Sequence, residues 1–194
     1  MLDFGCGDGG FASALGEATG AEVFGFEPAS ELRNIAKNIG LQILPSPIGA
    51  FDLIIMRGVL QYLENPFERI QELSKELRGN GSAFAILMTP DRDSLQYRRF
   101  GTMPVIANEE EWIRSVPSSK MLVKQFTESG YKVRKQRKMS TYLSSPYARP
   151  IHDLGSFLKA SMVDRNWKLN LQQSHNSTMR AWPGNIFNLI ATAC

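Results

Sequence analysis

Three glycines and a carboxylate near the start of the chain form the pattern with the clearest chemical meaning. Gly5, Gly7 and Gly9 alternate with other residues directly after a short apolar run. Glycine lets a backbone turn sharply and approach a ligand where any Cβ would collide. Glu27 ends a second apolar run about 20 residues later, an offset at which a carboxylate can hold ribose hydroxyls. The pattern therefore predicts a nucleoside-binding site.

Two classes of nucleotide ligand fit this glycine spacing. Gly5, Gly7 and Gly10 satisfy the G-x-G-x-x-G pattern of dinucleotide-binding proteins, which is a weak signal by itself. Asp3, however, precedes the first glycine at a place where that pattern normally has an apolar or small residue. A pyrophosphate would be repelled by a carboxylate beside it. The residues therefore favour a nucleoside ligand without a pyrophosphate, and a nicotinamide-dependent oxidoreductase stays as an alternative.

The elements that must position these residues alternate between strand and helix. Short apolar runs predict strands, and apolar residues at helical spacing predict helices. The predicted strands span residues 21–26, 41–44, 51–56, 82–88, 131–139 and 186–192, and the predicted helices span residues 11–17, 31–38, 66–77 and 120–128. A first strand can occupy only residues 1–4, which is short for a strand. Alternation of this kind specifies a parallel sheet with right-handed crossovers.

The apolar spacing also predicts which side chains of the first two helices are buried. The expected inward residues are Phe11, Ala14 and Leu15 on the first helix, and Leu32, Ile35 and Ala36 on the second. Ser30 precedes the second helix and is a residue type that caps helix N-termini well. We therefore expect Ser30 to cap this helix, which leaves the carboxylate of Glu27 free for a ligand.

Three longer motifs extend the pattern. The chain reads Leu-Asp-Phe-Gly-Cys-Gly from residue 2, Phe-Asp-Leu-Ile-Ile from residue 51, and Val-Leu-x-x-Leu-x-x-Pro from residue 59. With these motifs it resembles the class I S-adenosylmethionine-dependent methyltransferases, in the branch that acts on small molecules. The resemblance covers roughly residues 1–90 and the last strand. It implies an α/β, Rossmann-like fold, in which a seven-stranded, mostly parallel sheet has helices on both faces, an antiparallel last strand and, here, a shortened first strand.

The resemblance also implies which residues bind S-adenosylmethionine. In the family the acid orients the glycine loop, the glycines accept the amino-acid portion against bare backbone, and the strand-end acid holds the ribose. The implied cofactor-binding residues are Asp3, Gly5, Cys6, Gly7, Gly9, Phe26, Glu27, Pro28, Leu44 and Met56. Family members commonly hold the adenine with an acid after the third strand, and no acid lies between Leu44 and Phe51 here. We therefore expect backbone groups, Leu44 and Ile48 to hold the adenine.

The reaction that the resemblance implies is in-line transfer of a methyl group to an O, N or C nucleophile of a small molecule. Alignment and exclusion of water supply most of the acceleration in such a step. Where the family often has Glu-His, this chain has Gln61 and Tyr62, so that histidine is absent. His152 and His175 are then the candidates for deprotonating the acceptor, although each is more often a surface residue.

The chain length predicts one domain over residues 1–194, which the resemblance implies is methyltransferase-like. Its expected parts are a cofactor-binding half at 1–90, substrate or lid segments at 91–130 and 141–183, and a final strand hairpin at 131–140 and 185–192. The acceptor pocket is expected to form from residues 89–107 and the second of these lid segments. The short first strand also fits a truncated or shortened member, so a non-catalytic methyltransferase-like protein is a further alternative.

Composition restricts the partners. The chain is 43% apolar and 21% charged, which is ordinary for a globular protein, and its net charge of +3 is too small to indicate a nucleic-acid partner. No apolar run reaches the ~20 residues of a membrane span, and no signal peptide is visible at the start. Cys6 and Cys194 form no disulfide framework, which predicts the cytoplasm. The two histidines lack the acid or thiol neighbours of a metal site. The oligomeric state stays open.

Overall fold

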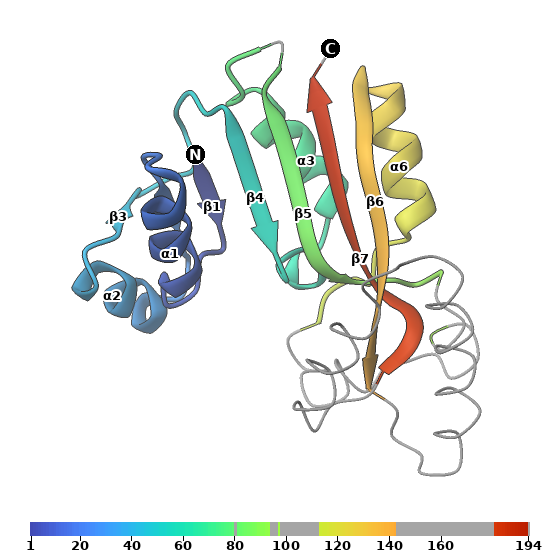
Figure 1. Cartoon of the computed structure of the whole chain (residues 1–194), viewed down its shortest axis with the longest axis horizontal. Helices are drawn as coiled ribbons and strands as arrows, with labels where there is room; N and C mark the ends of the chain where they lie inside the picture. The colour runs from blue at the N-terminus through green and yellow to red at the C-terminus, as the bar shows by residue number, and fades with distance from the viewer. Residues whose placement is uncertain (80, 94–96, 98–112, 143–180, 194) are drawn as a thin grey trace.

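The computed structural model describes residues 1–79, 81–93, 97, 113–142 and 181–193. Within them, seven strands form one sheet in the order β3-β2-β1-β4-β5-β7-β6 (Figure 1). The strands are Leu2–Phe4 (β1), Phe24–Phe26 (β2), Gln42–Ile43 (β3), Leu53–Arg57 (β4), Ala83–Pro90 (β5), Tyr131–Tyr142 (β6) and Ala181–Ala193 (β7). Strands β1 to β5 pair in parallel, and β7 is antiparallel to both β5 and β6. This arrangement confirms the mostly parallel sheet, the antiparallel last strand and the short first strand.

Helices cover both faces of the sheet. They are Gly10–Thr19 (α1), Ser30–Asn38 (α2), Pro66–Ser74 (α3) and Ser119–Glu128 (α6), with a 3-10 turn, η1, at Leu60–Tyr62. Helices α1 and α2 lie beside β1 to β3, and α3 and α6 lie beside β4 to β7 on the opposite face (Figure 1). Each pair encloses its own apolar cluster. None of the helices in the described part of the chain combines the length and apolar character needed to cross a membrane.

The inward faces of α1 and α2 differ from the prediction. On α1 the buried residue is Ala12, whereas Ala14 is exposed. On α2 only Ala36 is buried, while Leu32 and Ile35 are 40% and 47% exposed. A Cβ added at Gly9 would lie only 2.9 Å from the Cβ of Ala36. Helix α2 therefore packs through its smallest side chain against a glycine, which leaves its larger side chains at the margin of the contact.

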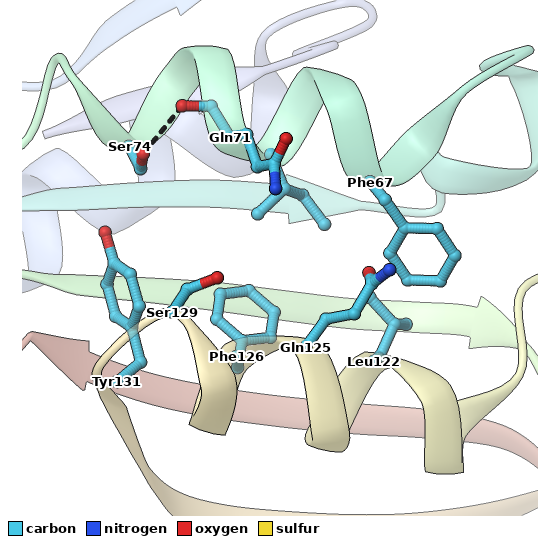
Figure 2. Close-up of a pocket in the computed structure, with 9 residues that line it drawn as sticks. Phe67, Gln71, Ser74, Leu122, Gln125, Phe126, Ser129 and Tyr131 are labelled. Carbon is cyan, nitrogen blue, oxygen red and sulfur yellow. Dashed lines mark hydrogen bonds between the residues drawn. The ribbon is translucent and has the colours of Figure 1, made fainter.

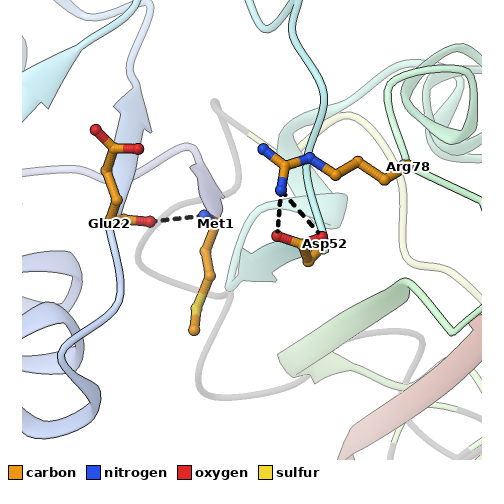
Figure 3. A network of polar contacts seen from close by, with 4 residues as sticks. All are labelled: Met1, Glu22, Asp52 and Arg78. Carbon is orange, nitrogen blue, oxygen red and sulfur yellow. Dashed lines mark hydrogen bonds and ion pairs between the residues drawn. The ribbon is translucent and has the colours of Figure 1, made fainter.

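Helix α3 is shorter than the apolar spacing predicts. It ends at Ser74, and the following residues turn back so that Leu77 forms a parallel bridge with Phe51. This bridge takes Phe51 out of β4, which begins at Leu53. Nearby, Arg78 forms an ion pair with Asp52 at 3.0 Å, and the ammonium group of Met1 donates to the carbonyl of Glu22 at 2.7 Å (Figure 3). These exposed contacts join the amino ends of the strands, and the ion pair contributes little to stability.

Helix α6 matches its predicted range closely. The hydroxyl of Ser118 caps it by accepting the N–H of Met121 at 3.1 Å. A shallow groove runs between α3 and α6, with Phe67 and Phe126 on its walls (Figure 2). Its cavity of about 30 Å³ is too small for more than about one or two water molecules. The groove is therefore a packing gap between two helices and not a nucleoside site.

Candidate functional site

The loop between β1 and α1 places its three glycines in the left-handed region. The angle φ is 74° at Gly5, 59° at Gly7 and 81° at Gly9, values that a residue with a Cβ adopts only with strain. A Cβ added at Gly5 would lie 2.6 Å from the side chain of Val59, and one added at Gly9 would meet α2. A Cβ at Gly7 would have no described neighbour within 4 Å. Close packing thus accounts for Gly5 and Gly9, and Gly7 faces open space.

Glu27 reaches from the end of β2 into this loop and is only 8% exposed. Its Oε2 accepts the N–H of Gly7 at 2.9 Å, and its Oε1 accepts the N–H of Ala29 at 2.9 Å. The expectation that Ser30 caps α2 is wrong, because the N-cap residue is Ala29. The carboxylate of Glu27 therefore already accepts hydrogen bonds from two backbone N–H groups. Since a carboxylate accepts at about four lone-pair positions, each of its oxygens keeps acceptor capacity.

The end of β2 holds the glycine loop through backbone as well. The carbonyl of Phe26 accepts the N–H groups of Gly5 and Cys6 at 2.8 and 3.1 Å. The ring of Phe26 stacks on Phe4 with centroids 5.2 Å apart, in the core cluster that α3 covers. Pro28 is exposed. Phe26 thus contributes its carbonyl to the loop, while its ring belongs to the core of the opposite face.

Asp3 lies beneath the loop at the end of β1 and is 2% exposed. Its Oδ1 is buried and has no hydrogen-bond partner in the described part of the chain. The pKa of this carboxyl is raised to about 6, mainly by burial. The charge of Arg57 lowers the pKa and the charge of Glu27 raises it, both by less than burial does. A buried oxygen without a partner costs free energy, which a ligand that donates a hydrogen bond would recover.

Cys6 lies in the same loop with its thiol buried. The pKa of this thiol is raised to about 12, mainly by burial and to a smaller extent by the nearby charges of Asp3 and Glu27. The thiolate, not the thiol, is the nucleophilic form of cysteine. Cys6 is therefore an inert, packed residue of the loop and not a nucleophile.

The residues predicted to hold the adenine and the methionine end lie at different depths. Met56 is fully buried in the cluster under α3, so only its backbone can face the site. Leu44 packs against the same cluster, and its N–H donates to the carbonyl of Gly25 at 2.8 Å. Ile48 is 69% exposed. The assignment of these residues to ligand atoms stays a prediction.

Arg57 and Phe11 belong to the site, and the sequence patterns did not single out either for it. Strand β4 pairs with β1 so that Ile55 lies beside Asp3, which puts Arg57 on the same face of the sheet as Asp3. The guanidinium carbon of Arg57 lies 4.6 Å from the ring centroid of Phe11 in the first turn of α1. What places Arg57 near Asp3 is the register between β1 and β4, which the sequence alone does not reveal.

Gln61, like Asp3, has a buried side-chain oxygen that accepts no hydrogen bond from the described residues. It is 6% exposed in η1, and its Nε2 donates to the carbonyl of Gly58 at 2.8 Å. Its Oε1 is buried without a partner in the described residues. Its backbone carbonyl accepts the N–H groups of Arg114 and Ser115, which attaches the segment before α6 to η1. Tyr62, its neighbour, is 41% exposed.

The two histidines predicted as catalytic candidates fall in a part of the chain that the structure does not describe. His152 and His175 lie outside the described residues, as does most of the predicted acceptor pocket. Among the residues that are described, no group of histidine, cysteine and acidic side chains is arranged to hold a metal ion. The polar groups that do come together are Asp3, Glu27 and the backbone of the glycine loop.

Comparison with known proteins identifies the family. The sequence model of a family described as a methyltransferase domain matches residues 1–136, which is more than half of the chain. The chain belongs to this family. The matched range includes the glycine loop, Glu27 and Arg57. The resemblance to class I S-adenosylmethionine-dependent methyltransferases is thereby confirmed, and the protein is an enzyme of the methyltransferase class. A search of curated proteins found no match.

Solved methyltransferases share this fold at low sequence identity. An S-adenosylmethionine-dependent methyltransferase from Archaeoglobus fulgidus has a TM-score of 0.64 at 15% identity, over 98% of this chain and 84% of that one. The magnesium protoporphyrin IX methyltransferase from Synechocystis PCC 6803, with S-adenosylhomocysteine bound, has a TM-score of 0.61 at 14% identity, over 100% and 73%. The plantazolicin methyltransferase, also with S-adenosylhomocysteine, has a TM-score of 0.58 at 17% identity, over 99% and 74%. The methyltransferase therefore shares the fold of these enzymes.

Proposed function

We propose that this methyltransferase binds S-adenosylmethionine at the carboxyl ends of β1 and β2 and transfers its methyl group to an O, N or C nucleophile of a small molecule. One observation carries the proposal. Glu27 reaches from β2 to the N–H of Gly7, beside a buried oxygen of Asp3 that has no described partner. Ligands of open parallel sheets bind at this end of the strands.

The residues of the site fit the groups of S-adenosylmethionine. The orphaned Oδ1 of Asp3 is an acceptor that suits the ammonium group of the amino-acid end. The carboxylate of Glu27 keeps lone pairs that suit two neighbouring ribose hydroxyls. The open side of Gly7 is a space that a Cβ would fill. An acid at position 3 would instead repel the pyrophosphate of a nicotinamide cofactor.

The residues of the chain act by binding and orienting. S-adenosylmethionine supplies the chemistry, a methyl group on a positively charged sulfur. Asp3 and Glu27 supply two negative charges, which favour a cationic ligand over an anionic one. Cys6 keeps its proton at neutral pH, because burial raises the pKa of its thiol to about 12, so it does not compete with the acceptor as a nucleophile. Since alignment and exclusion of water supply most of the acceleration, few catalytic side chains are needed.

A small-molecule acceptor fits a cavity of about 440 Å³ at the same end of the sheet. The cavity lies between the start of α3 and the segment that precedes α6, with Glu64, Phe67, Arg92 and Val116 in its lining. Arg92 falls in the range from which we expected the acceptor pocket. One of the similar structures, the magnesium protoporphyrin IX methyltransferase, is named for a small-molecule acceptor.

Titration calorimetry with S-adenosylmethionine, S-adenosylhomocysteine and NAD tests the proposal directly. We expect heat of binding from the first two ligands and none from NAD. Binding of NAD alone would support an oxidoreductase. Binding of none of the three would support a non-catalytic methyltransferase-like protein.

Substitution of Glu27 tests the ribose contact. Glu27→Ala should weaken S-adenosylhomocysteine binding by about 1–3 kcal/mol, because it removes a partner of polar ribose groups. The variant also frees two backbone N–H groups, so thermal unfolding must be measured in parallel. Glu17→Ala is the matched control, since Glu17 is an exposed acid on α1. Equal dissociation constants for the Glu27 variant and the wild type would contradict the proposed site.

A further inference from the structure

We infer that Arg57 binds the carboxylate of the methionine end of the cofactor, so that Asp3 and Arg57 together form a clamp for a zwitterion. This inference rests on the proposed function and adds a specificity residue to the same site.

The sheet register places the two charges side by side. Asp3 is the second-last residue of β1, which ends at Phe4, and its partner on β4 is Ile55. Side chains two residues apart on a strand point to the same face, so Arg57 projects from the face on which Asp3 lies. Both residues stand at the carboxyl ends of neighbouring parallel strands. The charge of Arg57 also lowers the pKa of Asp3, which burial raises.

The guanidinium of Arg57 has hydrogen-bond donors that no described residue uses. Its carbon Cζ lies over the ring of Phe11, 4.6 Å from the ring centroid, a cation–π contact that holds the guanidinium beside the first turn of α1. Within the described part of the chain it forms no ion pair and no hydrogen bond. The contrast is Arg33, whose Nη1 already donates to the carbonyls of Glu27 and Pro28 at 3.0 Å. All the guanidinium donors of Arg57 beside the loop are therefore left unused by the described residues, whereas Nη1 of Arg33 is already occupied.

The chemistry of the cofactor's amino-acid end matches this pair. An α-amino acid carries its ammonium and its carboxylate on one carbon, so its binding site must offer an anion and a cation within a few ångströms of each other. The orphaned oxygen of Asp3 supplies the anion. The planar fork of an arginine binds a carboxylate through two parallel hydrogen bonds, which a lysine cannot do. The cation–π contact with Phe11 holds the guanidinium near the loop before the ligand arrives.

Decarboxylated S-adenosylmethionine is the probe that isolates the carboxylate, because it keeps the nucleoside, the sulfonium and the terminal ammonium. Calorimetry is done without any acceptor, so an anionic acceptor cannot contribute. We expect the wild type to bind decarboxylated S-adenosylmethionine about 10- to 100-fold more weakly than S-adenosylmethionine, the size of a charge-assisted hydrogen-bond contribution.

Two variants of Arg57 and one control complete the test. Arg57→Met should weaken S-adenosylmethionine binding about 10- to 100-fold and leave binding of the decarboxylated compound within about two-fold. Arg57→Lys should lie between the wild type and Arg57→Met, since it keeps the charge and loses the fork. Arg69→Met is the matched control, because the Arg69 guanidinium also stands over a phenylalanine ring, at 6.0 Å from Phe4, on the opposite face. It should bind both ligands as the wild type does.

Two results would overturn the inference. One is an unchanged affinity of Arg57→Met for S-adenosylmethionine, and the other is an equal loss for both compounds, which would assign Arg57 to a part of the ligand other than its carboxylate. In both cases wild-type binding of S-adenosylmethionine would leave the proposed function standing. A wild type that binds neither compound would instead refute the proposed function itself.

Discussion

Replacing Asp3 by asparagine should make the protein more stable while it weakens ligand binding. The carboxyl of Asp3 is 2% exposed, and its Oδ1 has no described partner. Burial raises its pKa from the ordinary 3.8 to about 6, with smaller opposing contributions from Arg57 and Glu27. Asparagine has nearly the same shape and does not ionise, so Asp3→Asn removes the cost of a buried charge. Sites that bind ligands often carry a cost of this kind.

The magnitude follows from the size and direction of the shift. Between about pH 4 and pH 6 the folded protein holds a proton on Asp3 that the unfolded chain has released, so the free energy of unfolding falls as the pH rises. A shift of about two pKa units corresponds to about 3 kcal/mol. The stability of Asp3→Asn relative to the wild type should therefore increase by about 3 kcal/mol from pH 4 to pH 7 and stay constant above.

Urea denaturation of both proteins at several pH values between 4 and 8 measures this difference, because contributions from all other groups cancel. Asp52→Asn is the control, since the side chain of Asp52 is 67% exposed and its ion pair with Arg78 is worth little. A relative stability of Asp3→Asn that does not change with pH, or that falls as the pH rises, would refute the assignment of Asp3 as a buried, unpartnered acid.

Two other predictions concern the glycine loop. Gly7→Ala should lower the free energy of unfolding by about 1–2 kcal/mol, because φ is positive there and the space is open, whereas Gly9→Ala should cost more, since its Cβ would also lie 2.9 Å from Ala36. Urea denaturation measures both, and an equal or smaller loss for Gly9→Ala would contradict this packing. In a Cys194→Ser background, the thiol of Cys6 should react with iodoacetamide at pH 8 far more slowly in the folded protein than in urea, because burial raises its pKa to about 12. Comparable rates in the two states would contradict its burial.

The sequence patterns predicted the elements better than they predicted packing. The spacing of the glycines and Glu27 predicted that the glycine loop and the end of β2 belong to one site. The structure brings these two segments together, since Glu27 accepts a hydrogen bond from Gly7. Apolar spacing failed for Leu32 and Ile35, because it shows which residues share a helix face but not how closely that face approaches the sheet. The close contact depends on Gly9 and Ala36, two residues that hydropathy does not distinguish.

Arg57 shows a second limit of prediction from a single sequence, besides helix packing. A charged residue after an apolar strand is ordinarily solvent-exposed, and nothing in the local sequence distinguishes this one. Its relation to Asp3 depends on the register between β1 and β4, and its orientation depends on Phe11 from a third element. Residues that acquire a role through strand register are found only when the pairing is known.

The position of β7 has a consequence for how the molecule is made. This strand lies between β5 and β6, and its Leu189 and Ala191 are fully buried, yet it is synthesised after the six other described strands of the sheet. Until then β6 has no neighbour in the sheet, and the edge of β5 stays open to pairing with other chains. The sheet is therefore complete only after residues 181–193 have been synthesised, and a nascent chain halted before residue 181 would hold the glycine loop without the strand that joins β5 to β6.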